Sequence, residues 1–287
     1  MVIRPIAFES MGTRSMATLV TTDDCSVLID PGVSLAPLRY NLPPHPLELQ
    51  RETEHWIQIV DHARGADVLV VTHYHYDHHN PGEPEIFTGK VALVKHPRES
   101  INRSQQERAA YFLNRLRQIP GEFHFSDGEE FTFGKTNVRF SKAVYHGANS
   151  KLGYVTEVLV KEEFKFLHTS DVEGPVTDSQ VAFILEQDPD ILFCDGPMTY
   201  MLGVRYSQQN LKKSINNLIG IIQNTGVKKL ILDHHFLRDL RWRERIGPVF
   251  EAAEAKGVEV LTAAQFGGLR NDLLEARRRE LYGETSA

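Results

Sequence analysis

Hydrophobic positions along the chain fall into short runs that alternate with longer amphipathic stretches. Short runs rich in β-branched residues predict strands, and apolar spacings of three and four predict helices that bury one face. The predicted strands cover residues 2–8, 16–20, 25–30, 67–72, 91–95, 131–134, 137–144, 153–160, 164–167, 190–194, 228–233 and 258–261. The predicted helices cover residues 47–64, 99–117, 177–187, 207–224, 244–256 and about 270–281.

This order of elements predicts an α/β (α+β) protein in which helices are interspersed among strands. The strands are too many for one sheet of ordinary size, so two sheets are expected. No repeat, low-complexity tract or linker-like change of composition divides the chain, and we expect a single domain over residues 1–287. Residues 33–46 contain four prolines and predict an irregular surface loop, placed where it could cover a site.

Composition narrows the class of protein. Apolar residues make up 41% and charged residues 24% of the 287 positions, which is typical of soluble globular proteins. The net charge of −6 argues against a protein that depends on non-specific nucleic-acid binding, which needs a basic face. No signal-peptide pattern and no apolar run of about 18 residues is present, so we expect a cytoplasmic protein that does not span a membrane.

Cysteine usage excludes two further classes. Cys25 and Cys194 are the two cysteines of the chain, and they stand far apart without a C-x-x-C spacing. A disulfide scaffold and a thiolate zinc cluster are therefore both disfavoured.

A dense group of metal-ligand side chains follows the predicted strand at 67–72. The sequence there reads T-H-Y-H-Y-D-H-H, and its candidate ligands are His73, His75, Asp77 and His78. Imidazole nitrogens and carboxylate oxygens are the ligands that suit zinc and similar first-row metals. A single histidine here would favour a polar surface loop, but three histidines and an aspartate directly after a buried-type strand favour a metal site.

One loop cannot close two metal sites alone, so further ligands are expected at other strand ends. His146 follows the predicted strand at 137–144, and Asp171 follows the one at 164–167. His234 follows the predicted strand at 228–233. Each is a ligand type at the exit of an apolar run, as expected where one rim of a sheet sandwich holds the site.

The motif H-Y-H-Y-D-H, with the strand-end His146, Asp171 and His234 in this order, resembles the metallo-β-lactamase superfamily. The Asp30 turn after VLI resembles the first motif of that superfamily. More narrowly, THYHYDHHNP, HTSDVEGP, DGPMTY and LDHHFLRD resemble a group of uncharacterised, mostly archaeal predicted metallohydrolases. The resemblance implies a four-layer αββα sandwich, in which two mixed β-sheets are flanked by helices and the metals lie at one edge between the sheets.

The resemblance also implies a ligand set for two divalent metal ions. The first ion would be bound by His73, His75 and His146, the second by Asp77, His78 and His234, with Asp171 bridging both. Asp77 and Asp171 are accordingly the expected catalytic residues. Zinc is the expected metal, with manganese and iron as alternatives.

Other residues are expected to support this ligand set. The resemblance implies that Asp30 orients the histidine loop, a role that carboxylates beside metal ligands commonly have. His79 extends the histidine run and is expected to support the loop or contact substrate. The alignment of ILDHHFLRD favours His234 as the last ligand, and His235 is then expected to support the ligands. A shift of the alignment by one residue would make His235 the ligand instead.

The predicted activity is hydrolysis by hydroxide activated between two metal ions. His75 stands where the flavodiiron oxidoreductases of the superfamily tend to carry glutamate, which favours zinc hydrolysis over iron redox chemistry. A small phosphodiester is the favoured substrate, with Tyr200, Arg238 and Arg241 as candidate contacts, because arginine matches phosphate geometry. The arginines could instead form a solvated helix face.

Three alternatives stay open at this point. A lactone, ester or thioester would be attacked by the same hydroxide. An iron-dependent oxygenase and a non-catalytic, nucleic-acid-associated factor are more distant possibilities. We expect a small-molecule partner, no membrane and no strong nucleic-acid signature, and the sequence carries no pattern that sets the oligomeric state.

Overall fold

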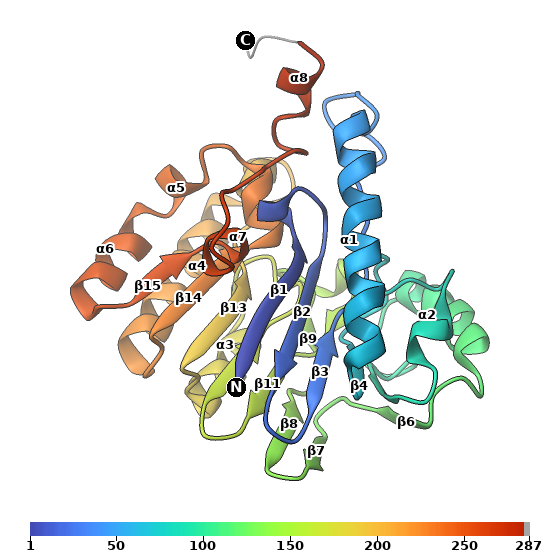
Figure 1. Ribbon diagram of the computed structural model, residues 1–287. Helices are drawn as coiled ribbons and strands as arrows, with labels where there is room; N and C mark the ends of the chain where they lie inside the picture. The colour runs from blue at the N-terminus through green and yellow to red at the C-terminus, as the bar shows by residue number, and fades with distance from the viewer. Residues whose placement is uncertain (284–287) are drawn as a thin grey trace.

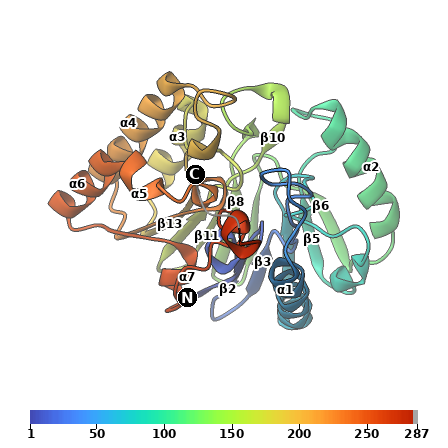
Figure 2. The same ribbon diagram turned by 90° about the horizontal axis from the view of Figure 1, so that it is seen from above.

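The computed structural model describes residues 1–283, and its strands form two mixed sheets that pack face to face (Figures 1 and 2). The first sheet has the strand order β1-β2-β3-β4-β5-β6. Its strands are β1 (Val2–Phe8), β2 (Met16–Thr21), β3 (Ser26–Ile29), β4 (Val68–Val71), β5 (Val91–Val94) and β6 (Glu122–Phe125). β1 to β3 pair antiparallel, whereas β3 to β6 pair parallel.

The second sheet has the strand order β15-β14-β13-β12-β11-β8-β7. Its strands are β7 (Glu130–Phe133), β8 (Thr136–Phe140), β11 (Val158–Lys161), β12 (Lys165–His168), β13 (Ile191–Asp195), β14 (Lys229–Asp233) and β15 (Glu259–Leu261). β12 to β15 pair parallel, whereas the pairs β12–β11, β11–β8 and β8–β7 are antiparallel. A separate short pair joins β9 (Val144–Tyr145) to β10 (Tyr154–Val155).

Helices cover both outer faces of the sandwich (Figure 2). The first sheet is covered by α1 (Pro46–Gly65) and α2 (Arg103–Leu116), and the second by α3 (Asp178–Gln187), α4 (Gln208–Asn224) and α6 (Gly247–Lys256). Three further α-helices span a single turn each: α5 (Trp242–Arg245), α7 (Ala263–Phe266) and α8 (Arg278–Leu281). The described chain also has five 3-10 helices: Glu9–Met11, Pro84–Phe87, Ser150–Leu152, Thr199–Met201 and His234–Arg238. No helix within residues 1–283 is long and apolar enough to cross a membrane.

The apolar side chains form three layers of core, one between the sheets and one under each set of helices. Between the sheets, the ring of Phe193 contacts Phe8 of the first sheet and Phe166 of the second at centroid distances of 5.8 and 5.0 Å. The other two layers lie between α1, α2 and the first sheet, and between α3, α4, α6 and the second. The layers confirm the predicted αββα sandwich of two mixed sheets.

The structure corrects the predicted helix at about 270–281. Only Arg278–Leu281 is helical, and residues 270–277 follow an irregular path. The segment is irregular because its polar groups bind residues that are far away in the chain. Glu275 pairs with Arg14 at 2.6 Å, and the backbone nitrogen of Asp272 donates to the carbonyl of Ser10 at 2.8 Å.

Three further predicted elements are divided in the structure. The predicted helix at 244–256 breaks at Ile246 and resumes as α6, with Pro248 in its first turn. The predicted strand at 153–160 divides into β10 and β11, because the backbone nitrogen of Thr156 donates to Thr72 of the other sheet. The predicted strand at 137–144 divides into β8 and β9.

Candidate metal centre

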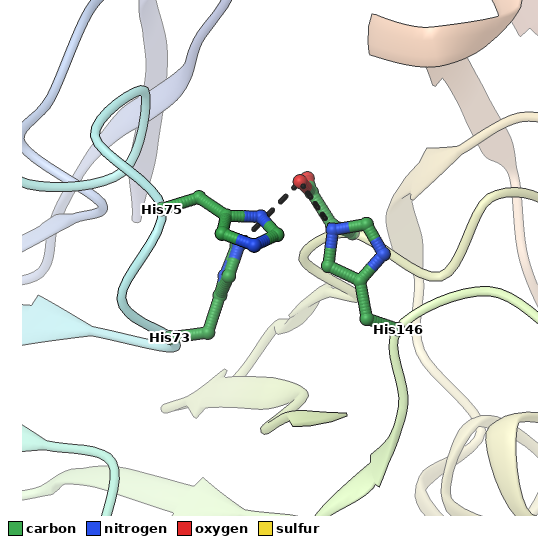
Figure 3. Close-up of side chains that lie close together, drawn as sticks. His73, His75 and His146 are labelled. Atoms are coloured by element: carbon green, nitrogen blue, oxygen red, sulfur yellow. Dashed lines mark ion pairs between the residues drawn. The ribbon is translucent and has the colours of Figure 1, made fainter. Parts of the chain in front are cut away.

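Chain segments that follow β4, β9, β12 and β14 meet at one edge of the sandwich and bring the predicted ligands together. Two groups of side chains offer ligand atoms that all lie within 4.8 Å of one another: His73, His75, His146 and Asp171, and Asp77, His78, His234 and Asp171. The rings of His73, His75 and His146 turn toward one another from two different loops (Figure 3). Asp171 belongs to both groups.

The carboxylate of Asp171 presents one oxygen to each group. Its Oδ2 lies 3.5 Å from Nε2 of His73 and 3.2 Å from Nε2 of His146. Its Oδ1 lies 2.9 Å from Nε2 of His78 and 3.3 Å from Nε2 of His234. A carboxylate placed in this way can bridge two cations.

Several of these buried atoms lack hydrogen-bond partners. Within residues 1–283, no hydrogen bond satisfies Nε2 of His73, Nε2 of His78, both ring nitrogens of His146, Nδ1 of His234 or Oδ1 of Asp171. A buried polar atom without a partner is costly, and so many in one place imply a missing partner. Nitrogen and carboxylate donors that converge in this way fit divalent cations such as zinc.

The turn after β3 holds the histidine loop in place. Asp30 accepts hydrogen bonds from the backbone nitrogen of Thr72 at 2.9 Å and from its hydroxyl at 2.8 Å. Oδ2 of Asp30, which accepts from the hydroxyl, also lies 2.8 Å from Nδ1 of His78. A Cβ atom at Gly32 would collide with the backbone of His79, so a glycine there allows the turn and the loop to approach closely.

Strained backbone is concentrated around the centre. Asp30, Ser170, Glu173 and His234 have positive φ angles between 51° and 60°, a region that residues other than glycine seldom adopt. Each lies at the end of a strand or one turn beyond it. Such strain persists where the surrounding structure holds it, and it is typical of functional sites.

Burial and neighbouring charges set the protonation of the histidines. Burial lowers the pKa of His75 to about 3 and that of His73 well below its ordinary value, so both imidazoles are neutral near pH 7. Burial also disfavours the charged form of His78, but the Asp171 and Asp30 carboxylates outweigh it and raise the pKa of His78 well above its usual range. A neutral imidazole is the form that binds a metal.

The two adjacent histidines after β14 have different surroundings. His234 faces Asp171 and lies 3.6 Å from Asp77 through Nε2. His235 instead directs Nδ1 to the carboxylate of Asp195 at 2.9 Å, and its backbone nitrogen donates to the same residue at 3.0 Å. His235 belongs to a third group of potential ligands with Asp171 and Asp195.

Two acidic residues contact side chains of the centre although the sequence analysis did not select them as candidates. Asp195, which appeared in the sequence analysis only as the first residue of DGPMTY, is fully buried and its carboxylate contacts Nδ1 of His235; its position at the end of β13 was the available signal. Glu9 lies near the start of the chain, where no pattern marked it. It is buried, its carboxylate is 3.1 Å from Nε of Arg238, and it lies 3.7 Å from Nδ1 of His234.

Two further candidates, His79 and Arg238, lie close to the centre. His79 is buried, its Nδ1 contacts the carbonyl of His75 at 2.9 Å, and its ring packs on Phe112, so it supports the loop. Arg238 is buried beside the centre, with Nη2 3.4 Å from Nε2 of His234 and Nη1 3.5 Å from the hydroxyl of Tyr200.

Arg241 does not share that environment. It is exposed and pairs with Glu244 at 2.7 Å on the surface, so the expectation that Arg241 accompanies Arg238 at the site needs correction. The physical reason is the non-helical segment 239–241, which separates the buried turn that ends at Arg238 from α5 and leaves Arg241 at the surface.

The loop at 33–46 reaches this side of the centre. Arg39 donates from Nη2 to the backbone carbonyl of Arg238 at 2.9 Å and stacks on Tyr200 at 4.7 Å. Its neighbour Tyr40 donates to the carbonyl of Ala276 at 3.2 Å. The loop is therefore docked beside Tyr200 and Arg238 by specific contacts.

Comparison with known proteins places these observations in a family. No protein-family model matches the chain. A UPF0282 protein of Korarchaeum cryptofilum is 50% identical over 282 residues, spanning 98% of this chain and 94% of the relative. A UPF0282 protein of Sulfurisphaera tokodaii is 46% identical, spanning 98% and 93%.

Solved structures share the fold. A possible metal-dependent hydrolase from Veillonella parvula superposes with a TM-score of 0.53 at 16% identity, covering 91% of this chain and 94% of that one. The archaeal relatives confirm the resemblance to a mostly archaeal group of proteins, and the solved structure shows that the predicted fold is shared. The chain belongs to the UPF0282 family.

Proposed function

We propose that this protein is a metal-dependent hydrolase whose two cations are zinc ions held by the two groups that share Asp171. The observation that carries the proposal is the placement of one Asp171 oxygen toward each group, with buried and unpartnered histidine nitrogens around both. Two such ions, when bound, would supply a hydroxide for attack on an electrophilic carbonyl or phosphorus centre.

The protein's own residues would prepare the centre for this chemistry. Asp30, by contacting Nδ1 of His78, leaves Nε2 of that ring facing Asp171. Hydroxyl groups of Thr72 and Ser170 lie 3.2 Å from Nδ1 of His73 and leave its Nε2 facing the same carboxylate. Residues that fix ring orientation in this way commonly tune metal affinity.

Arg238 supports a phosphodiester as the substrate. Its guanidinium group is buried against His234 and Tyr200, where it would meet the oxygens of a phosphate bound at the second group. Arginine binds phosphate through paired hydrogen bonds. One observation favours the alternative of a lactone, ester or thioester: Glu9 already balances the charge of Arg238 at 3.1 Å.

Metal content tests the proposal directly. We expect elemental mass spectrometry to find about two metal ions per wild-type chain, and Asp171→Ala to lose metal together with nearly all turnover. The exposed Asp178→Ala is the matched control and should behave as wild type. A variant Asp171→Ala that keeps both metals and its activity would overturn the proposal, and one iron per chain would favour the oxygenase alternative.

A pair of model substrates separates the two hydrolase classes. For the phosphodiester class, Arg238→Lys should lower kcat/KM for bis(p-nitrophenyl) phosphate by about tenfold or more and leave p-nitrophenyl acetate unchanged. Arg241→Lys, on the exposed surface, is the control and should change neither rate. An equal effect of Arg238→Lys on both substrates would remove the phosphodiester from consideration.

A further inference from the structure

A cavity of about 420 Å³ opens beside the centre on the side of His146. His146 and Glu173 form its inner end, so a molecule in the cavity would reach the first group of candidate ligands. One wall is formed by residues 148–152 and the other by residues 198–210. A concave space of this size beside a reactive centre is typical of a small-molecule site.

Both walls are fixed by hydrogen bonds of their own. Asn149 accepts a hydrogen bond from the backbone nitrogen of Lys151 at 3.0 Å, and the side chain of Asn102 donates to the carbonyl of Lys151 at 2.8 Å. In the opposite wall, the backbone nitrogens of Arg205 and Tyr206 donate to the carbonyl of Met201 at 3.0 and 3.1 Å. The backbone on each side is therefore preorganised.

Each wall carries one cation that the protein does not neutralise. Lys151 and Arg205 line the cavity and are exposed, and neither forms an ion pair with any residue in 1–283. Glu173, the acidic residue of the lining, is directed inward to His146 at 3.6 Å and His235 at 3.9 Å. Arg238 on the other side of the centre contrasts with this pair, since Glu9 balances its charge.

Apolar side chains also line the cavity. Leu152 and Val204 are 39% and 81% exposed, and Met198 is buried at the cavity wall. Exposed apolar side chains beside unpaired cations suit a ligand with an apolar body and an anionic group.

We propose that this cavity binds the part of the substrate away from the scissile bond, and that this part carries an anionic group held by Lys151 and Arg205. The inference rests on the proposed hydrolase function and specifies its substrate class as an organic anion with an apolar portion. Lys151 and Arg205 would determine specificity without touching the reacting atoms. Hydrogen bonds from these charged donors to the anionic group would favour an anionic substrate over a neutral one.

Calorimetric titration of the metal-loaded protein tests the inference without requiring turnover. The probes are benzenesulfonate and the neutral benzyl alcohol. We expect the double variant Lys151→Ala/Arg205→Ala to bind benzenesulfonate at least about tenfold more weakly than wild type, with binding of benzyl alcohol unchanged. The control Lys212→Ala/Lys213→Ala removes the same charge from the exposed face of α4 and should match wild type.

The outcomes separate this inference from the proposed function. Loss of benzenesulfonate binding in the cavity variant alone would support the inference, even if no hydrolysis of any ester were found. Equal binding by the cavity variant and wild type, or no saturable binding at all, would overturn the inference while leaving metal content and hydrolysis to decide the function. An equal loss in the control variant would attribute the binding to overall charge and would also overturn it.

Discussion

The carboxylate of Asp30 lies 2.8 Å from Nδ1 of His78, although the two residues are separated by 48 positions in the chain. The same carboxylate accepts two hydrogen bonds from Thr72, which immediately precedes the histidine loop. Asp30 thus joins the end of β3 to the loop after β4 and sets the direction in which His78 presents Nε2.

Asp30→Asn should weaken metal binding because the amide cannot hold His78 as the carboxylate does. Loss of such an orienting carboxylate typically costs about 10–100-fold in metal affinity. Competition with a chromogenic chelator would measure the affinity, and circular dichroism would verify that the variant is folded. The exposed Asp23→Asn serves as control. Unchanged affinity in Asp30→Asn would show that the turn does not position the ligand.

The adjacent histidines after β14 should respond differently to substitution. His234 faces Asp171 and Asp77, whereas His235 is directed to Asp195. We expect His234→Ala to bind about one metal ion fewer per chain and His235→Ala to keep the wild-type content, as measured by elemental mass spectrometry. The reverse pattern would assign the ligand to His235.

Arg278 should be important for stability because it ties the C-terminal segment to the start of α1. Its guanidinium group is fully buried, is paired with Glu48 at 2.7 Å, and donates to the backbone carbonyls of Ala36 and Leu42. Arg278→Ala would leave the Glu48 carboxylate buried without its partner, and should lower the free energy of unfolding by about 3–5 kcal/mol.

Denaturant titration would measure that loss, with the exposed Arg277→Ala as control. The double variant Glu48→Leu/Arg278→Met removes both charges and should recover part of the stability. If Arg278→Ala were as stable as wild type, the ion pair would not contribute to holding the segment.

Glu157 should make stability depend on pH. Its carboxyl group is buried, neither oxygen has a hydrogen-bond partner within residues 1–283, and burial raises its pKa well above the usual value. Between the ordinary pKa and this raised value, the folded state holds a proton that the unfolded state has lost. Stability should therefore fall as pH rises, by about 1.4 kcal/mol per pH unit from this group.

Comparison of unfolding free energies from pH 5 to 8 would isolate this contribution. Glu157→Gln has a neutral side chain at every pH, so residue 157 no longer contributes to the pH dependence of the free energy of unfolding. The stability of this variant relative to wild type should therefore increase as pH rises. The exposed Glu163→Gln should retain the wild-type profile. Parallel profiles for Glu157→Gln and wild type would contradict the assignment.

Much of the fold could be predicted from local patterns, and the failures have a common cause. The predicted strands at 67–72 and 228–233 contain continuous apolar runs, at 68–71 and 230–232, because parallel strands are buried on both faces. These runs make the strands visible in the sequence. The prediction of a helix at 270–281 was wrong for residues 270–277, where Glu275 pairs with Arg14, which is far away in the chain. Local propensity does not reveal such partners.

The candidate site divides in the same way. The run from His73 to His78 stands in one loop, so its chemistry could be predicted from spacing. Glu9 stands in no motif and Asp195 begins DGPMTY, but neither position reveals its partner. Only the folded chain brings Glu9 to Arg238 and Asp195 to His235.

By itself, the sequence determined most of the strands, although not β6, together with the histidine loop and the strand ends that carry His146, Asp171 and His234. The reason is that hydrophobic periodicity and residue chemistry are properties of neighbouring positions. The tertiary structure decided which Asp171 oxygen faces which histidines, that Arg238 is buried while Arg241 is exposed, and that Lys151 and Arg205 line one cavity. These relationships depend on distances between segments far apart in the chain, which are set only when the two sheets pack.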